Sequence, residues 1–174
     1  MSTAPAVCVH MHATPVHPID LPAAGACTCH KVRSLARRLT GLYDAALAAH
    51  GLTVTQYSAL VTLARANAPV PVAELARRLQ MDRTTTSRLV GPLEAAGLLV
   101  RADGGKGHAD ARSRPLQLTT KGRRRLSAAV PAWRAAQRDV DAILGERLRA
   151  NLDRAADAAG VALVAAAIEP TEIA

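Results

Sequence analysis

Thiol groups near the start of the chain could react with oxidants. The sequence reads CTCHK from position 27. Cys29 is expected near a helix N-terminus, close to Lys31 and Arg33, and such positive surroundings favour the reactive thiolate. Cys27 could then act as a resolving thiol. A bond between Cys27 and Cys29 of one chain would be strained, so a disulfide across subunits or a mixed disulfide is favoured.

Metal capture is a second chemistry for the same region. The candidate ligands are thiols and imidazoles: Cys8, His10, His12, His17, Cys27, Cys29 and His30. This pattern is rich in ligands but lacks the spaced CxxC pairs of a structural zinc site. In a third alternative this region is idle, and an ordinary ligand pocket uses polar or aromatic groups further along: Tyr43, His50, Tyr57 and Trp133. The sequence leaves all three alternatives open.

The distribution of charge points to a different chemistry, the binding of a polyanion. The chain has 22 Lys and Arg against 14 Asp and Glu, a formal net charge of +8. Residues 77–125 hold twelve of these basic residues and four of the acidic ones, so the whole excess lies there. This is the electrostatic footprint of a nucleic-acid-binding segment. Aromatic residues are only 2% of the chain, which argues against stacking on single strands.

The stretch MDRTTTSRLVGPLEAAGLLV, from Met81, lies inside this basic segment. Asp82 is the predicted N-cap of a helix that bends at Gly91-Pro92. Its outward face would carry short hydroxyls, which let the backbone approach DNA, and arginines, which bind guanine or phosphate. These residues are Arg83, Thr84, Thr85, Ser87 and Arg88. The opposite face, with Leu89, Leu93 and Ala96, would hold the helix to the domain.

A Gly-rich basic loop, DGGKGHADARSR, follows at positions 103–114. Lys106, Arg112 and Arg114 are its candidate contacts to the DNA backbone or minor groove. Asp110 is expected to pair with a nearby arginine and orient it. The loop therefore predicts a second, basic site beside the helix.

The elements that must position these residues follow from periodicity. Residues 1–26 contain four prolines and predict a flexible arm. Helices are expected over about 30–50, from Thr53 or Thr55, over VAELARRLQM, and from Thr119 or Thr120 to about 168 in two segments. LLVRA and PLQLT alternate as two short strands. The predicted fold is mainly α with a small β-hairpin wing: a winged helix-turn-helix lobe plus a helical dimerisation region.

At this point the sequence resembles the MarR family (multiple antibiotic resistance regulators). The matching stretches are GLTVTQYSAL, ELARRLQMDRTTTSRLVGPLEAAGLL, the DAR of the loop, and LQLTTKG. The resemblance covers about residues 30–165 within a domain of 27–174. It implies a DNA-binding lobe over about 53–120 and dimerisation helices over about 30–50 and 120–168.

This family resemblance also implies a function. The chain would be a homodimeric repressor of pseudo-palindromic duplex DNA, with Arg83 to Arg88 in the major groove and Arg112 at the minor groove. A small-molecule effector or thiol oxidation would release the DNA. Cys29 and Tyr43 resemble residues of the organic-hydroperoxide-sensing branch, although two other tyrosines of that branch fall on Arg33 and Val54 here. The alternative is a non-specific architectural DNA-binding protein.

Several other classes are not predicted. No segment reads as a membrane span or a signal peptide, and three cysteines make no disulfide framework, so a cytoplasmic protein is expected. A phosphate loop, a Ser-His-Asp signature and paired carboxylates are all missing from the sequence, so we do not expect an enzyme or a required cofactor.

Overall fold

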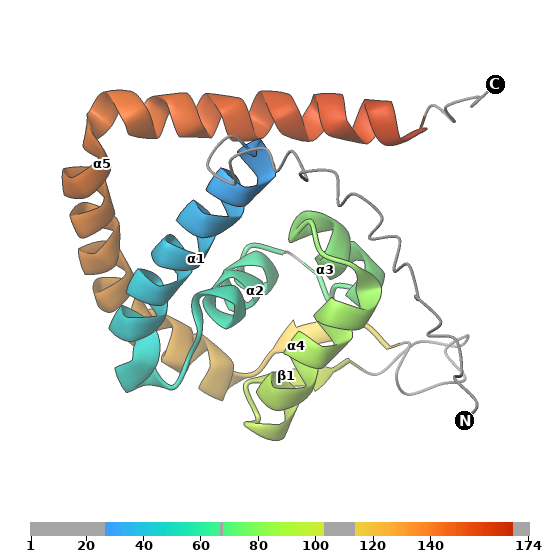
Figure 1. Cartoon of the computed structure of the whole chain (residues 1–174). Helices are drawn as coiled ribbons and strands as arrows, with labels where there is room; N and C mark the ends of the chain where they lie inside the picture. Colours follow the sequence, from blue (N-terminus) through green and yellow to red (C-terminus); the bar gives the residue numbers. More distant parts are fainter. Residues whose placement is uncertain (1–26, 67, 103–113, 169–174) are drawn as a thin grey trace, which may run out of the picture. The chain divides into compact units, whose positions relative to one another are not determined.

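The computed structural model describes residues 27–66, 68–102 and 114–168, which form six helical elements and two strands. In chain order these are α1 (Thr28–Leu47), η2 (Ala48–His50), α2 (Val54–Ala64), α3 (Val72–Arg78), α4 (Arg83–Ala95), β1 (Leu99–Arg101), β2 (Leu116–Leu118) and α5 (Thr120–Ile168) (Figure 1). The described residues fall into two units, which divide between Ala36 and Arg37. The predicted arm of residues 1–26 lies outside the described residues.

The predicted fold class is confirmed: the described chain is mainly helical with one antiparallel hairpin. β1 and β2 pair with Leu99 opposite Leu118 and Arg101 opposite Leu116. Val70 adds a β-bridge to this hairpin, which the sequence did not predict. The Val70 amide donates to Leu116 O at 2.9 Å, and the Val70 carbonyl accepts from Leu116 N at 2.7 Å. Both α4 and α2 contact this small sheet, and Figure 1 shows α4 lying beside it.

Side-chain caps fix where the helices begin. Thr53 starts α2 with a capping box, in which its hydroxyl accepts from Gln56 N and Gln56 Oε1 accepts from Thr53 N. Thr119 starts α5, since its hydroxyl oxygen accepts from Gly122 N at 2.9 Å. Gly51 follows η2 with φ 62°, the left-handed conformation expected of a glycine that ends a helix. The structure thus selects Thr53 and Thr119 from the pairs that the sequence left open.

The core of the second unit is built from aliphatic side chains of α1, α2, α3, α4, α5 and the hairpin. Leu47, Leu60, Leu75 and Leu116 are fully buried, and each such leucine contributes about 1.5–3 kcal/mol. Ala64, at the end of α2, is exposed. The inner face of α2 is formed by Tyr57, Ala59, Leu60 and Leu63.

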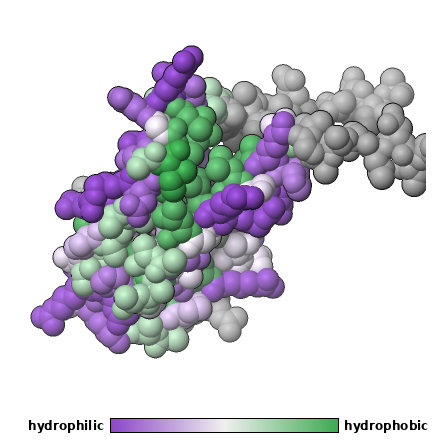
Figure 2. Space-filling view, turned by 60° about the vertical axis from the view of Figure 1, so that its left-hand side comes forward, coloured by the Kyte–Doolittle hydropathy of each residue, from purple (hydrophilic) through white to green (hydrophobic). Residues whose placement is uncertain are grey.

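The long helix α5 is interrupted at Gly145. This residue has φ 72° and ψ 155°, so the helical path breaks there and continues in a second segment, in agreement with the two predicted segments. Apolar side chains on both sides of the break are exposed: Ile143 by 72% and Leu148 by 47%. Figure 2 shows hydrophobic surface on this side of the molecule, bordered by hydrophilic side chains. None of the described helices is both long and apolar enough to cross a membrane.

Candidate nucleic-acid interface

A tight turn joins α3 to α4. Gln80 has φ 53°, a left-handed conformation that residues other than glycine adopt uncommonly. The turn is closed by hydrogen bonds from Gln80 N to Arg77 O at 3.2 Å and from Met81 N to Ala76 O at 2.9 Å. These bonds satisfy the last carbonyls of α3 and fix the direction in which α4 leaves. Nothing in the residue type of Gln80 signals this conformation.

Asp82 caps α4 as predicted. Its carboxylate accepts from Thr85 N at 2.8 Å and also from the Thr85 hydroxyl. Both hydrogen bonds hold the pKa of Asp82 below its usual range, and the bond from the Thr85 hydroxyl has a larger effect than the bond from the Thr85 amide. The start of α4 is therefore fixed by an ionised carboxylate at neutral pH.

The helix α4 is one continuous element through Gly91 and Pro92, as the sequence predicted. Its buried face begins earlier than predicted, at Thr86, and continues with Val90 and Leu93. Ala96 was expected to anchor the helix but is exposed. The two faces of α4 therefore run side by side along its length.

The five predicted DNA-facing residues of α4 are all exposed: Arg83, Thr84, Thr85, Ser87 and Arg88. Their hydroxyls are not equivalent. Thr85 donates to Asp82, and Ser87 donates to Arg83 O at 2.9 Å, whereas the Thr84 hydroxyl has no hydrogen-bond partner within the part of the chain that the structure describes. Thr86 is buried and donates to Asp82 O at 2.9 Å, so its role is internal.

The positive charge of residues 77–125 divides into cations held within the protein and cations that face solvent. Arg77 and Arg78 both pair with Glu74 at 2.7 Å, and Lys121 Nζ donates to Ala96 O at 2.7 Å, at the end of α4. Arg125 donates to the carbonyl of His50. In the described part of the chain, four exposed arginines of this segment make no ion pair or hydrogen bond: Arg83, Arg88, Arg123 and Arg124.

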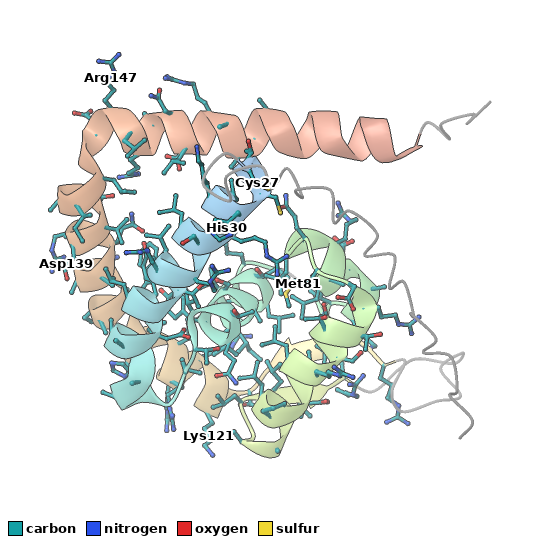
Figure 3. All side chains as sticks on the ribbon, viewed as in Figure 1. Cys27, His30, Met81, Lys121, Asp139 and Arg147 are labelled. Carbon is teal, nitrogen blue, oxygen red and sulfur yellow. The ribbon has the colours of Figure 1, made fainter. Side chains whose placement is uncertain are left out.

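Half of this unpaired charge lies on α4. Arg83 and Arg88 are on its exposed face, among the hydroxyls that the sequence singled out. Arg123 and Arg124 lie in the first turn of α5, where Lys121 is labelled in Figure 3. Sequence reasoning counted these two arginines in the charge but did not name them as candidate contacts. The run RRR at 123–125 was the available signal.

A salt bridge ties α4 to the base of the wing. Arg101 of β1 pairs with Glu94 of α4, with Nε 2.8 Å from Oε1, and also donates to Arg114 O at 3.3 Å. Arg114 is half-buried at this base. Lys106, Asp110 and Arg112 lie outside the described residues. Sequence reasoning missed the Glu94–Arg101 pair, because nothing in the spacing shows that the two side chains meet.

The sensor candidates lie on α1 and just before it. Cys27, Cys29 and His30 are exposed, and Cys27 and His30 are labelled in Figure 3. Tyr43 lies further along the helix, where its hydroxyl donates to Gln137 Oε1 at 2.6 Å. Burial, and then the nearby charge of Asp141, raise the pKa of Tyr43, so its hydroxyl is neutral at physiological pH.

Metal capture and an ordinary ligand pocket remain the other two hypotheses, and only some of the residues that they name are described residues. These contain no group of three His, Cys, Asp or Glu side chains that could hold a metal. Cys8, His10, His12 and His17 lie outside them. Tyr57 stacks on Trp133 with ring centroids 5.8 Å apart and belongs to the core. An open cleft of about 340 Å³ lies between the end of α2 and α3, and none of the four predicted pocket residues lines it.

Together, the α3–turn–α4 unit, the exposed arginines and hydroxyls of α4, and the adjoining two-stranded wing define a winged helix-turn-helix, DNA-binding transcriptional regulator. A family model described as the MarR family matches residues 50–108. No curated protein matches the chain.

Solved structures identify the family further. The transcriptional regulator MosR of M. tuberculosis is 34% identical, with a TM-score of 0.68 over 80% of this chain and 99% of that chain. MosR in complex with DNA is 37% identical, with a TM-score of 0.65 over 78% of this chain and 98% of that chain. The transcriptional repressor CouR, bound to a 23-mer DNA duplex, is 28% identical, with a TM-score of 0.60 over 81% of this chain and 94% of that chain. Another structure of CouR is of the protein from Rhodococcus jostii RHA1. The present chain belongs to the MarR family.

Proposed function

We propose that this protein is a sequence-specific, homodimeric repressor that binds pseudo-palindromic duplex DNA through α4. The observation that carries the proposal is the exposed face of α4. It presents two arginines that have no partner among the described residues, Arg83 and Arg88, together with three exposed hydroxyls. The opposite face is anchored by Thr86, Val90 and Leu93, so the exposed face is held rigidly.

In this proposal the wing makes the second contact. Lys106, Arg112 and Arg114 would reach the neighbouring backbone or minor groove, with Asp110 orienting an arginine. The Glu94–Arg101 pair at the base supports this role, because it couples the position of the wing to that of α4. Loss of this pair would then displace the wing relative to α4 and weaken the binding of DNA at both sites.

A homodimer is supported by apolar surface outside the DNA-binding lobe. The helix α1 has a single fully buried residue, Leu47, and α5 exposes Ile143 and Leu148. Exposed apolar faces of long helices are typical of protein–protein interfaces. A C2 dimer would cover them and would place two copies of α4 about one DNA turn, about 34 Å, apart.

Footprinting of the DNA upstream of the protein's own gene tests the proposal. We expect two protected half-sites about 10 base pairs apart, and a dimer in sedimentation measurements. Protection that spreads evenly over any duplex would instead support a non-specific architectural protein, the alternative that the basic charge also permits.

We infer that a small-molecule effector or thiol oxidation releases the DNA. The family resemblance implies such release, and the exposure of Cys27 and Cys29 makes them accessible to oxidants. DNA release should be measured against peroxides, metal ions and aromatic acids, with Cys29→Ser as the control. If that variant responds to oxidants as the parent does, thiol sensing by Cys29 is wrong.

A further inference from the structure

Both carboxylate oxygens of Asp82 are engaged by a single residue. Thr85 N donates to Oδ1 at 2.8 Å, and the Thr85 hydroxyl donates to Oδ2. The first bond is an ordinary helix cap. The second is not needed for capping, yet it directs the only proton of an exposed hydroxyl toward the protein.

The proton is held firmly because its acceptor is charged. A hydrogen bond to a carboxylate is roughly twice as strong as one between neutral groups. A threonine hydroxyl has one donor and two lone pairs, so the Thr85 oxygen presents lone pairs alone to anything outside. Thr85 is the third residue of α4, and the first residues of a recognition helix are those that meet base edges.

We propose that Asp82 makes Thr85 a hydrogen-bond acceptor, so that α4 selects adenine or cytosine opposite Thr85. In the major groove, adenine N6 and cytosine N4 are donors, whereas guanine and thymine present only acceptors there. This inference rests on the proposed function and names part of its operator specificity. Asp82 acts as a positioning residue through Thr85 and needs no contact with DNA itself.

The hydroxyls of Thr84 and Ser87 differ from that of Thr85, because neither donates its proton to a carboxylate. Thr84 is exposed, and its hydroxyl has no partner in the described chain, so it can donate or accept. Ser87 donates to the neutral carbonyl of Arg83 at 2.9 Å, a weaker bond that rotation can break. Thr84→Val is therefore the matched control for Thr85→Val, because the same atom is lost from the same helix without involving Asp82.

Selection from randomised duplexes tests the proposal. Thr85→Val should flatten base preference at one position in each half-site. At that position the parent should favour adenine or cytosine over guanine and thymine by about fivefold, the value of one hydrogen bond at the low end of base discrimination. Thr84→Val should leave that position unchanged.

Asp82→Ser then separates the role of Asp82 from capping. Serine caps a helix about as well as aspartate, but it lacks the second, charged oxygen that accepts the Thr85 proton, so that proton is held less firmly. We expect the preference to fall to about twofold or less as thymine and guanine become acceptable partners. The variant also loses a negative charge, which raises affinity for every duplex, so the ratio between bases is compared and not the affinity.

A third arm needs no change at Asp82. Replacing the selected base by an analogue without its amino group should weaken binding of the parent about fivefold and leave Thr85→Val unaffected. A guanine or thymine at the Thr85-dependent position, no position that depends on Thr85, an unchanged ratio in Asp82→Ser, or no loss with the analogue would each overturn the inference. A parent protein that selects no sequence at all would instead contradict the proposed function.

Discussion

Replacement of Gly122 by alanine should loosen the junction between the hairpin and α5. Gly122 is buried in the first turn of α5. A Cβ at this position would lie 2.1 Å from Leu98 O and 2.9 Å from Leu118 Cδ2, closer than real Cβ contacts allow. The Leu98 carbonyl cannot move away freely, because it accepts from Thr119 N at 3.1 Å.

The size of the effect follows from three contributions. Overpacking of this kind costs about 1–3 kcal/mol, and loss of the Thr119–Leu98 hydrogen bond would add about 1 kcal/mol. Alanine recovers about 1 kcal/mol of helix propensity. The net loss of about 1–3 kcal/mol should lower Tm by about 3–10 °C for a chain of this size.

Gly91→Ala is the matched control for this change. Gly91 is exposed within α4, and a Cβ there meets nothing within 4 Å. This variant should be stabilised by about 0.5–1 kcal/mol. Both should be measured by denaturant unfolding at one protein concentration, since the stability of a dimer depends on concentration. If Gly122→Ala is as stable as Gly91→Ala, the packing described here is wrong.

Three further changes test other parts of the structure. Arg88→Ala should relax base preference, whereas Arg112→Ala should lower affinity evenly across sequences; binding to the selected operator and to its single-base variants, measured in parallel, compares the two. Hydrogen bonds from Arg77 and then Arg78 lower the pKa of Glu74 from 4.5 to about 2, so its contribution to stability is complete above pH 4.5 and is lost as the pH falls toward 2. Unfolding at low salt over this range should therefore be less pH-dependent in Glu74→Gln, and an identical acid profile would contradict the pairing. Gly145→Ala places a side chain where φ is 72° and ψ is 155°, a region that is almost exclusive to glycine, so α5 should straighten and sedimentation should show a weaker dimer; an unchanged dissociation constant would count against a role for the break.

The parts of the fold that follow from local rules could be predicted from the sequence. The cap at Asp82, the continuity of α4 and the two short strands each depend on residues within a few positions of one another. The exposed face of α4 was predicted for the same reason, because helical spacing alone separates Arg83 and Arg88 from the buried Val90. The prediction of Ala96 as an anchor was wrong because the helix ends beside it, and the chain turns before the side chain can be covered.

The features that depend on tertiary contacts could not be predicted. Formal charge does not distinguish Arg88, which faces solvent, from Arg101, whose partner Glu94 is brought near only when the hairpin folds against α4. The left-handed Gln80 has no sequence signal, since its conformation is imposed by the packing of α3 against α4. The second bond from Thr85 to Asp82 was also missed, although capping itself was expected, because it depends on the rotamer of one side chain.

The central claim, sequence-specific binding by α4, is tested most directly by the ratio of affinities for the selected operator and for a random duplex of equal length. We expect a ratio of about a thousandfold or more at physiological salt. Raising the salt should weaken both complexes as counterions compete, but the preference for the operator should persist. A ratio near one at every salt concentration would contradict the account and would leave a protein that recognises only the charge of DNA.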